Sequence, residues 1–350
     1  MTRDIVINGR FLSRRVTGVE RYGGEILRYI GNNSRVEKPA LSLVETTRLN
    51  GVAGHAWEQF ILPTKLNQHS ILWSPANTGP LMVRNQVLTV HDLSPLEHPE
   101  WFQPGFAAWY RLFLPTLIKR VKRMIVSSEY TKQKIMMRFG VKDVLVAPAG
   151  VDTNIFHPDV RQDRYEFPQE YILFVGSLQL RKNLQLLLKT WNEIKNDFAD
   201  TWLVVAGDSG RIFNNIKFVA YERVRFLGYV ADADLPGLYA NAKLFVLPSL
   251  DEGFGLPALE AMACGTPVIV SDGGALPETV GDAAMIFNLN TLGSDGLPSD
   301  RLGIAIKECL SNSNLHSSLK EKGLARAKIF SWQTTADLIW KNLNEMQPRL

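Results

Sequence analysis

Short apolar runs alternate with amphipathic patterns along the whole chain of 350 residues. The runs have the length and composition of buried β-strands. In the first half they are Asp4–Asn8, Leu41–Glu45, Ile71–Ser74, Val87–Val90, Met124–Ser127 and Val144–Ala147. In the second half they are Tyr171–Val175, Trp202–Ala206, Val224–Leu227, Leu244–Leu247, Pro267–Val270 and Met285–Phe287. Strands that alternate with helices predict an α/β fold with parallel sheets.

Helical patterns fall between these strands. They are Val19–Ile30, Tyr130–Phe139, Leu184–Ile194, Leu235–Ala240, Pro257–Ala263 and Ser331–Met346. A polar stretch, Asp152–Gln169, carries two prolines and several charges and predicts a linker. We therefore expect two Rossmann-like, doubly wound domains that face a cleft, residues 1–165 and 166–330. Residues 331–350 are expected to form a C-terminal helix that packs back toward the N-terminal domain.

Composition favours an ordinary globular protein, with 45% hydrophobic and 21% charged residues. No apolar run approaches the roughly 20 residues that a membrane-spanning helix needs. The first residues enter a strand pattern at once, which predicts no signal peptide. The two cysteines, Cys264 and Cys309, supply neither a disulfide framework nor a metal cluster. These features predict a cytoplasmic, reducing compartment.

Charge is distributed unevenly between the two halves of the chain. Residues 1–160 carry 20 Lys and Arg against 13 Asp and Glu, a net charge of +7, whereas the remainder carries −3. The first half is therefore expected to meet an anionic partner such as a membrane surface or a lipid phosphate. No basic motif typical of nucleic-acid binding occurs, so nucleic acid is not an expected partner.

The segment Trp101–Arg123 combines aromatic residues with a basic end. One interpretation is an interfacial element that contacts an anionic membrane. The other is an amphipathic helix whose aromatic side chains face the core, interrupted at Pro115. The sequence leaves both interpretations open.

The run Glu252-Gly-Phe-Gly-Leu-Pro-Ala-Leu-Glu260 carries the clearest chemical signal. The pattern predicts a strand that ends near Pro248, a tight loop, and a helix that begins near Pro257. Glu252 then lies on the loop and Glu260 about one turn inside the helix. Free backbone N–H groups at a helix start bind anions, and carboxylates accept hydrogen bonds from hydroxyls. The run therefore predicts a site for a phosphorylated, hydroxyl-rich ligand.

Other polar residues follow predicted strands. Gly176 leaves a strand, and Arg181 and Lys182 then stand at a predicted helix start, where a bound pyrophosphate would offset their conflict with the helix dipole. His91 comes just past a buried strand and is followed by an aspartate, so a role in binding is about as plausible as a structural one. Gly18 lies in the first strand-to-helix turn, where a ligand could approach the backbone.

Two patterns admit a second interpretation. Asp232-Ala-Asp234 has the spacing of a motif that holds a metal and a nucleotide, but it precedes a helix that an aspartate would cap. Gly253-Phe-Gly255-Leu-Pro-Ala258, with Asp272 beyond it, imitates the dinucleotide fingerprint. In that fingerprint the glycine turn follows the first strand of a domain, whereas here the strand is among the last. The match is therefore interpreted as accidental.

The Glu252–Glu260 run, with its continuation to Gly273-Gly-Ala-Leu-Pro-Glu-Thr-Val-Gly, resembles the donor-site signature of the retaining GT-B glycosyltransferases of family 4. Val175-Gly-Ser-Leu-Gln-Leu-Arg-Lys-Asn, Phe226-Leu-Gly-Tyr-Val and His91-Asp92 match in the same order. The resemblance spans nearly the whole chain. It is strongest to bacterial enzymes that add mannose or related sugars to surface polysaccharides.

The resemblance implies roles for individual residues. His91, Glu252, Arg181 and Lys182 are the implied catalytic residues: His91 at the reacting sugar, Glu252 at the sugar hydroxyls, and the two cations at the leaving diphosphate. The implied nucleotide-sugar site comprises Gly18, Gly176, Ser177, Arg181, Lys182, Tyr229, Val230, Phe254, Gly255, Leu256 and Glu260, with Glu260 on the ribose. Ser177 stands where many relatives carry a basic residue, which leaves Arg181 and Lys182 with more of the phosphate charge.

The resemblance also implies a GT-B fold with an N-terminal acceptor domain and a C-terminal nucleotide-sugar domain. The expected reaction is retaining transfer without a metal or other cofactor. GDP-mannose is the first expected donor, with UDP- or dTDP-sugars possible, and a lipid-linked or oligosaccharide acceptor is expected at the inner membrane face. The alternatives are an NAD-dependent oxidoreductase and an inactive sugar-nucleotide-binding subunit.

Overall fold

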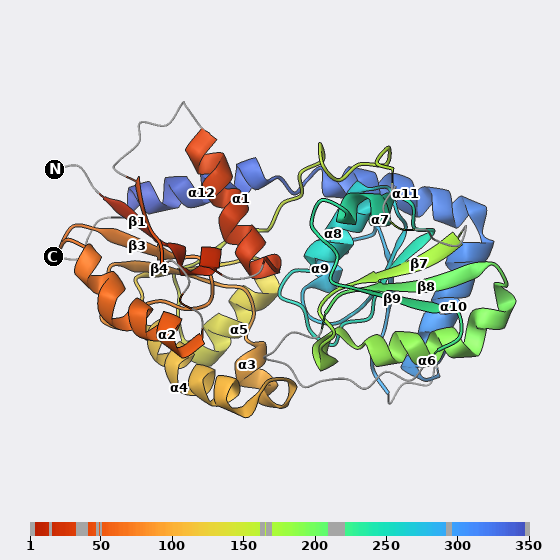
Figure 1. The fold of residues 1–350 in the computed structure, drawn as a ribbon, viewed down its shortest axis with the longest axis horizontal. Coiled ribbons are helices and arrows are strands. Elements are labelled where there is room, and N and C mark those ends of the chain that lie inside the picture. Colours follow the sequence, from red (N-terminus) through yellow and green to blue (C-terminus); the bar gives the residue numbers. More distant parts are fainter. Residues whose placement is uncertain are drawn as a thin grey trace. The chain divides into compact units, whose positions relative to one another are not determined.

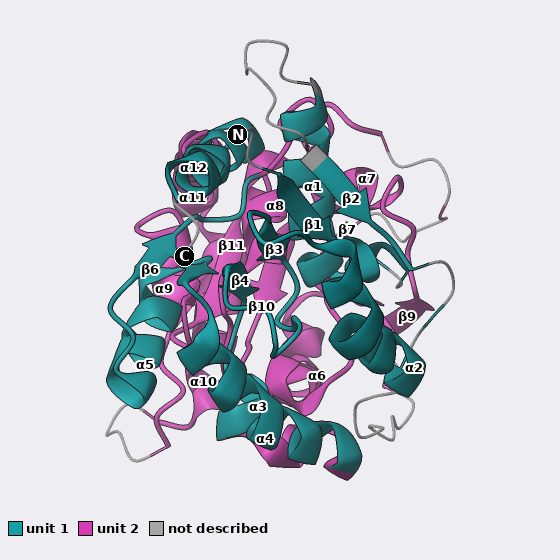
Figure 2. Ribbon diagram, turned by 90° about the vertical axis from the view of Figure 1, so that its left-hand side faces the viewer, with its two compact units in different colours: residues 1–97, 105–150, 331–350 teal, residues 98–104, 151–330 magenta. Residues whose placement is uncertain are grey.

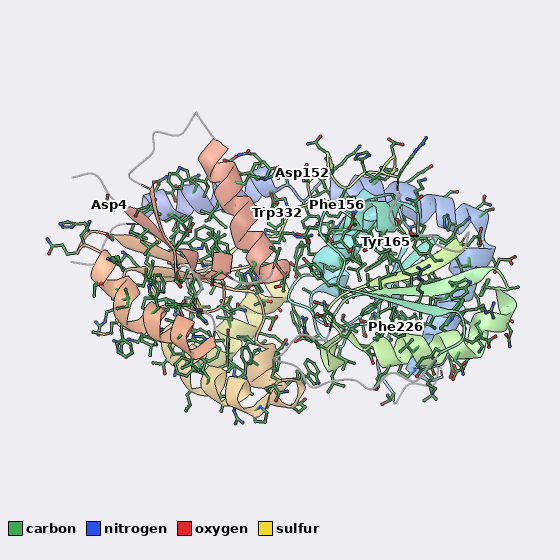
Figure 3. All side chains as sticks on the ribbon, in the orientation of Figure 1. Asp4, Asp152, Phe156, Tyr165, Phe226 and Trp332 are labelled. Atoms are coloured by element: carbon green, nitrogen blue, oxygen red, sulfur yellow. The ribbon has the colours of Figure 1, made fainter. Side chains whose placement is uncertain are left out.

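The chain folds into two compact units (Figure 2). The computed structural model describes residues 4–13, 16–32, 41–46, 49, 51–161, 165, 170–208, 221–291 and 296–346. Unit 1 comprises residues 1–97, 105–150 and 331–350, and unit 2 comprises residues 98–104 and 151–330. The long segment of unit 2 therefore begins at Val151, whereas the sequence placed the domain boundary after residue 165. Phe156 (Figure 3) lies in this segment, and its ring packs against Tyr239 of unit 2, with 6.1 Å between ring centroids.

Unit 1 is built on a parallel sheet with the strand order β2-β1-β3-β4-β5-β6 (Figure 1). The strands are β1 (Ile5–Asn8), β2 (Leu41–Val44), β3 (Ile71–Ser74), β4 (Gln86–Val90), β5 (Arg123–Val126) and β6 (Val144–Val146). Strands β1, β3 and β4 are buried along their whole length. Such complete burial is expected where helices cover both faces of a parallel sheet.

The helices of unit 1 lie on the two faces of this sheet. They are α1 (Gly18–Asn32), α2 (Gly51–Ala56), α3 (Ser94–Glu97), α4 (Pro104–Arg120), α5 (Glu129–Phe139) and α12 (Trp332–Glu345). Helices α1 and α12 lie together on one face, and α2, α4 and α5 lie on the other (Figure 1). Trp332 (Figure 3) lies at the start of α12 and packs edge-on against Tyr22 of α1. The C-terminal helix thus belongs to the core of unit 1.

Unit 2 has a second parallel sheet, with the order β12-β11-β10-β7-β8-β9. Its strands are β7 (Glu170–Val175), β8 (Thr201–Ala206), β9 (Val224–Gly228), β10 (Leu244–Leu247), β11 (Val268–Ser271) and β12 (Met285–Phe287). Its helices are α6 (Leu184–Ile194), α7 (Leu235–Ala240), α8 (Leu256–Ala263), α9 (Leu276–Val280), α10 (Pro298–Ser311) and α11 (Ser313–Ala327). Helices α6 and α10 pack together, as do α8 and α11. The chain runs outward in both directions from β7 and β10, so the strand order reverses between them.

The predicted strands are confirmed. Each of the twelve predicted strands matches a strand of the structure to within one residue at either end, and the predicted helices match to within two. The predicted interruption at Pro115 is wrong, because α4 continues through that residue. A proline inside a helix costs about 3 kcal/mol. Burial of Leu114, Leu117 and Ile118 on the same helix offsets that cost.

Two further observations concern single elements. Asp234 occupies the N-cap position of α7, as predicted, but its side chain makes no capping hydrogen bond. Among the described residues, every helix is too short or too polar to serve as a membrane-spanning segment.

Candidate active site

Two loops of unit 2 leave the sheet where its strand order reverses. One follows β7 and runs from Gly176 to Lys182, and the other follows β10 and runs from Ser249 to Gly255. Strands β7 and β10 are hydrogen-bonded neighbours, so their carboxyl ends lie side by side. The backbone N–H of Leu250 donates to the carbonyl of Arg181 at 2.8 Å and joins the loops directly. Ligands of open α/β sheets bind at this kind of reversal point.

Glu252 lies at the centre of a buried ionic cluster between these loops. Its Oε1 accepts hydrogen bonds from Lys182 Nζ at 2.5 Å and from the Ser249 hydroxyl at 2.7 Å. Its Oε2 accepts one from Arg181 Nη1 at 2.8 Å, and the same guanidinium nitrogen donates to the Asp251 carbonyl at 2.9 Å. The structure therefore brings three of the sequence-predicted residues into direct contact.

The electrostatics of this cluster favour an ionised carboxylate. Burial alone would raise the pKa of Glu252, but the charges of Arg181 and Lys182 and the hydrogen bonds from Lys182 and Ser249 outweigh burial and lower the pKa to about 2. Desolvating charges is costly, and close pairing in good geometry is what makes it tolerable. Here two cations, Arg181 and Lys182, contact one carboxylate.

Arg181 and Lys182 lie just before α6, at the helix start where the sequence places them. They lie in a 3₁₀ turn, Leu180–Lys182, and α6 begins only after Asn183, whose φ of 52° is left-handed. The turn directs both side chains toward Glu252. The carboxylate, together with the geometry of the turn, thus offsets the charge conflict that the sequence suggested.

The glycines next to the cluster allow close backbone packing. Gly255 is the N-cap residue of α8 with φ of 103°, and an added Cβ would lie 2.6 Å from a methyl carbon of Leu276. Gly274 has φ of 67°, and its Cβ would lie 2.4 Å from the backbone nitrogen of Glu252. The carbonyl of Glu252 accepts a hydrogen bond from Ala275 N at 2.8 Å. The segment after β11 therefore fixes the loop that carries Glu252.

Phe254 and Leu256 flank Gly255 at the start of α8. The Phe254 ring is buried and packs edge-on against Phe330, with 5.5 Å between ring centroids. Its carbonyl accepts a hydrogen bond from the Thr279 hydroxyl. The side chain of Phe254 thus belongs to the core, and what this loop can offer a ligand is backbone N–H groups at the helix start.

Glu260 lies one turn farther along α8. It is buried, and its Oε2 accepts a hydrogen bond from the hydroxyl of Tyr239 at 3.0 Å. Tyr239 is itself buried and packs edge-on against Phe245 of β10. The carboxylate therefore has a fixed orientation within unit 2.

The remaining predicted residues of unit 2 also follow the carboxyl ends of strands in this sheet. Gly176 lies against the aliphatic stem of Lys182, where an added Cβ would be 3.6 Å away. The Ser177 hydroxyl accepts a hydrogen bond from Gln179. Tyr229 and Val230 follow the edge strand β9; Tyr229 is 47% exposed, whereas Val230 is buried. Tyr229 is therefore the accessible member of this pair.

Two predicted residues, Gly18 and His91, belong to unit 1. Gly18 is the first residue of α1, and no atom lies near the position of an added Cβ. His91 directly follows β4 and is 9% exposed. Its ring packs edge-on against Tyr22 of α1, with 4.9 Å between ring centroids. Burial lowers the pKa of His91, although the Pro75 carbonyl, Asp92 and Glu20 act in the opposite direction.

The segment Trp101–Arg123 is divided between the units. Trp101 and Phe102 are buried residues of unit 2, and α4 belongs to unit 1 except for its first residue. On α4, Tyr110 and Phe113 lie in the core cluster against β4 and β5. Leu112 is 78% exposed. Most aromatic side chains of this segment therefore pack in cores, as the second sequence interpretation expects.

Sequence reasoning missed several residues that complete these clusters. Ser249 donates to Glu252, Tyr239 donates to Glu260, and Asn77 contacts the backbone of His91. Asn77 carried a detectable signal, because asparagine follows a buried strand there and is the residue after glycine that best tolerates a left-handed conformation. Tyr239 carried none, since it lies within an apolar helix.

Comparison with known proteins gives consistent matches. Residues 161–326 match the family model described as glycosyl transferases group 1, and residues 67–155 match glycosyltransferase Family 4. The O-antigen chain mannosyltransferase B of Escherichia coli is 30% identical over 269 residues, covering 73% of this chain and 68% of that protein. The serotype-specific mannosyltransferase WbdA of Escherichia coli is 29% identical over 273 residues, covering 72% of this chain but 32% of that protein.

A solved structure supports the fold. The sucrose-phosphate synthase of Thermosynechococcus elongatus superposes with a TM-score of 0.71 at 18% identity, covering 98% of each chain. A match at 18% identity supports the fold alone.

The Gly253–Ala258 pattern follows β10, the fourth strand of unit 2 in chain order. It therefore lacks the context of a dinucleotide site, in which the glycine turn follows the first strand. The chain belongs to the glycosyltransferase family that these two models describe, and it is a glycosyltransferase with the GT-B fold.

Proposed function

We propose that this glycosyltransferase transfers mannose from GDP-mannose to a lipid-linked or oligosaccharide acceptor during synthesis of a bacterial surface polysaccharide. Both curated relatives described above are named mannosyltransferases. The observation that carries the proposal is the Arg181–Lys182–Glu252 cluster at the strand reversal of unit 2. Such a cluster suits a ligand with a diphosphate next to hydroxyl groups.

The two cations would stabilise the leaving diphosphate. When the bond between the anomeric carbon and the phosphate oxygen breaks, negative charge develops on that oxygen. A guanidinium binds phosphate oxygens through a planar fork, and an ammonium acts as a point charge. Because Glu252 and the 3₁₀ turn hold both cations in place before the ligand arrives, little reorganisation is needed during the reaction. This arrangement supports transfer without a metal ion.

Glu252 would also bind the transferred sugar. A carboxylate offers about four lone-pair positions. Three donors, from Lys182, Arg181 and Ser249, already occupy it. A position therefore remains for one sugar hydroxyl. The same crowding argues against Glu252 as a nucleophile, since its charge is already shared between two cations.

The proposed transfer retains the anomeric configuration. The acceptor hydroxyl would approach from the face that the diphosphate leaves, and the departing phosphate oxygen would take the acceptor proton. The new carbon–oxygen bond then forms on the face where the old one broke. Glu260, held by Tyr239, would bind the ribose of the nucleotide that stays behind, and Tyr229 and Val230 would lie near its base.

A thermal-shift panel of GDP-, UDP- and dTDP-sugars tests the donor, because a ligand that binds only the native state raises the melting temperature. We expect the largest shift with GDP-mannose. A larger shift with a UDP- or dTDP-sugar would overturn the donor assignment. Transfer assays in EDTA and an NMR determination of the product anomer test metal independence and retention.

The role of the cations has its own test. Lys182→Ala should weaken binding of GDP and reduce transfer by about 10²- to 10³-fold, the usual loss of a group that stabilises transition-state charge. Lys243→Ala is the matched control, since Lys243 pairs with Glu170 at an exposed position of the same unit. Equal GDP affinity in both variants would contradict the proposed role. Donor binding with no transfer to any acceptor would favour the inactive binding subunit instead.

A further inference from the structure

Ser249, the second residue after β10, contacts the carboxylate of Glu252. Its Oγ lies 2.7 Å from Glu252 Oε1. The charges of Arg181 and Lys182 keep this carboxylate ionised, and an ionised carboxylate can only accept hydrogen bonds. The Ser249 hydroxyl is therefore the donor, and its hydrogen points at Oε1.

The surrounding backbone holds the Ser249 hydroxyl in place. Ser249 is fully buried, and its carbonyl accepts a hydrogen bond at 2.5 Å from the hydroxyl of Ser271, the last residue of β11. Gly273 packs so closely that an added Cβ would lie 2.2 Å from the same carbonyl oxygen. The next backbone N–H, that of Leu250, donates to the Arg181 carbonyl. Segments after two other strands, β7 and β11, thus fix the position of Ser249.

The donors divide unevenly between the two oxygens of Glu252. Oε1 accepts hydrogen bonds from both Lys182 and Ser249, whereas Oε2 accepts one from Arg181. Each carboxylate oxygen has two lone-pair positions, so Oε1 is fully occupied. Within the described part of the chain, no second donor reaches Oε2. The acceptor position that remains for a ligand therefore lies on Oε2.

We propose that Ser249 is a positioning residue that determines how Glu252 selects a hydroxyl of the transferred sugar. By occupying Oε1, the Ser249 hydroxyl leaves Oε2 as the acceptor, so the carboxylate binds one hydroxyl in one orientation. This role rests on the proposed function, in which Glu252 binds the sugar. All of the groups that it involves belong to unit 2.

The same carboxylate would recognise sugars differently without the Ser249 hydroxyl. Oε1 would then offer a second acceptor position, and two neighbouring hydroxyls could bind the carboxylate together. A site that binds a pair tolerates the loss of one member better than a site that depends on a single group. If Ser249 served only to satisfy a buried charge, its removal would lower stability and leave the selectivity for hydroxyls unchanged.

A double-mutant cycle tests the contact without any sugar. Ser249→Ala, Glu252→Gln and the double variant are compared with wild type by urea unfolding at pH 7. A hydrogen bond to an ionised group is stronger than one to a neutral amide. We therefore expect Ser249→Ala to change the unfolding equilibrium at least about threefold more in wild type than in the Glu252→Gln background.

Thr190→Val is the matched control for this cycle. Its buried hydroxyl donates to the Ser299 carbonyl at 3.3 Å, between α6 and α10. The effect of Thr190→Val should be the same in both backgrounds, because the pair is independent of Glu252. Equal effects of Ser249→Ala in the two backgrounds would overturn the contact, whatever sugar the enzyme uses.

Selectivity is tested by kcat/KM for GDP-mannose and its monodeoxy forms. In wild type we expect one monodeoxy donor to lose roughly tenfold to a hundredfold, the value of one hydrogen bond to a charged group, and the others to lose much less. In Ser249→Ala this difference should shrink to about threefold, with GDP affinity within about twofold of wild type. Because each donor is compared between the two proteins, its intrinsic reactivity cancels.

Ser249→Thr keeps the hydroxyl and should keep the wild-type selectivity. Unchanged selectivity in Ser249→Ala, or lost selectivity in a folded Ser249→Thr, would overturn the proposal. A wild-type enzyme that treats all monodeoxy donors alike would overturn it together with the proposed sugar contact of Glu252. If the thermal-shift panel selects another nucleotide sugar, monodeoxy forms of that sugar replace those of GDP-mannose. An error in the donor is thereby separated from an error in the role of Ser249.

Discussion

The two units build similar parallel sheets, and each carries a charged cluster at the reversal of its strand order. In unit 2 the cluster joins Arg181 and Lys182 to one carboxylate, Glu252. In unit 1 it joins Arg10 to Glu58, with side chains 3% and 1% exposed. The topology explains why polar side chains gather at both places. The difference in charge balance suggests what each cluster can do.

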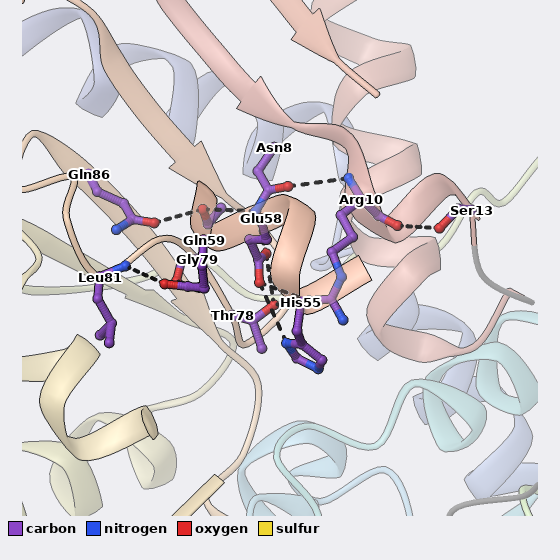
Figure 4. A network of polar contacts seen from close by, with 11 residues as sticks. Asn8, Arg10, Ser13, His55, Glu58, Gln59, Thr78, Gly79, Leu81 and Gln86 are labelled. Carbon is purple, nitrogen blue, oxygen red and sulfur yellow. Dashed lines mark hydrogen bonds and ion pairs between the residues drawn. The ribbon is translucent and has the colours of Figure 1, made fainter. Parts of the chain in front are cut away.

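The unit 1 cluster pairs Arg10 with Glu58, and Asn8 and Thr78 add hydrogen bonds to both residues (Figure 4). Such a network has little to offer an anionic ligand and is suited to holding a loop. In the unit 2 cluster two cations contact one carboxylate, an arrangement that suits a diphosphate ligand. One fold therefore supports an anchor in one unit and a candidate anion site in the other.

Glu58→Ala should give the largest effect, a loss of stability, and it tests whether the unit 1 cluster serves only as an anchor. Removal of one partner leaves Arg10 buried without its counterion, which typically costs 3–5 kcal/mol. We expect the free energy of unfolding in urea to fall by about that amount. The affinity for GDP should stay within about twofold of wild type, a change of about 0.4 kcal/mol.

Glu25→Ala is the control, because Glu25 pairs with Arg28 on the surface of α1. An exposed pair of this kind is worth about 1 kcal/mol or less. Loss of GDP affinity in Glu58→Ala at retained stability would show that the unit 1 cluster takes part in binding and is more than an anchor.

The fold could be predicted from the sequence because it depends on local patterns. Buried parallel strands are continuous apolar runs, so Ile71–Ser74 and Leu244–Leu247 matched their predicted bounds. The predicted interruption at Pro115 was wrong because burial of neighbouring side chains outweighed the tendency of proline to end a helix. Arg181 and Lys182 were predicted at the start of a helix and do precede α6, but the 3₁₀ turn that contains them was not predicted.

The contacts within the site could be predicted less well. Glu252 meets Lys182 across 70 residues of sequence. Strand order alone decides that their loops are neighbours, and no local pattern encodes that order. The hydrogen bond from the Tyr239 hydroxyl to Glu260 could not be predicted for the same reason. The polar ends of strands could therefore be identified, but the partners across the sheet could not.

Glu252→Gln gives the next largest effect and tests the charge balance of unit 2. The substitution keeps the shape of the side chain but removes the charge that Arg181 and Lys182 contact. We expect GDP to bind at least as well as to wild type, because the two cations no longer pair with the charge of Glu252. Transfer should fall by about 10²-fold, because the carboxylate no longer binds the sugar. Equal losses of binding and transfer would contradict the separation of these roles.

Glu252→Gln also tests how the stability contributed by Glu252 depends on pH. The pKa of Glu252 in the folded protein, about 2, lies below its ordinary value of 4.5. Its contribution to stability is therefore complete above about pH 4.5 and is lost as the pH falls toward 2. The difference in unfolding free energy between wild type and Glu252→Gln should be constant from pH 7 to 5 and should shrink in more acidic buffer. A difference that grows on acidification would exclude the ion pairs as its cause.

The smallest effect is expected from Tyr239→Phe, which removes only the hydroxyl that orients Glu260. A hydrogen bond to a charged group is worth about 1.5–3 kcal/mol, but here Glu260 keeps its place in α8 and loses only its orientation. We expect the preference for GDP over 2′-deoxy-GDP to fall about threefold to fivefold, close to 1 kcal/mol. Tyr171→Phe is the matched control, since its buried hydroxyl donates to the Leu238 carbonyl in the same unit. Both variants should lose some stability, and only Tyr239→Phe should alter ribose discrimination. If the two variants discriminate equally, Tyr239 serves the core alone, and the nucleotide role of Glu260 loses its structural support.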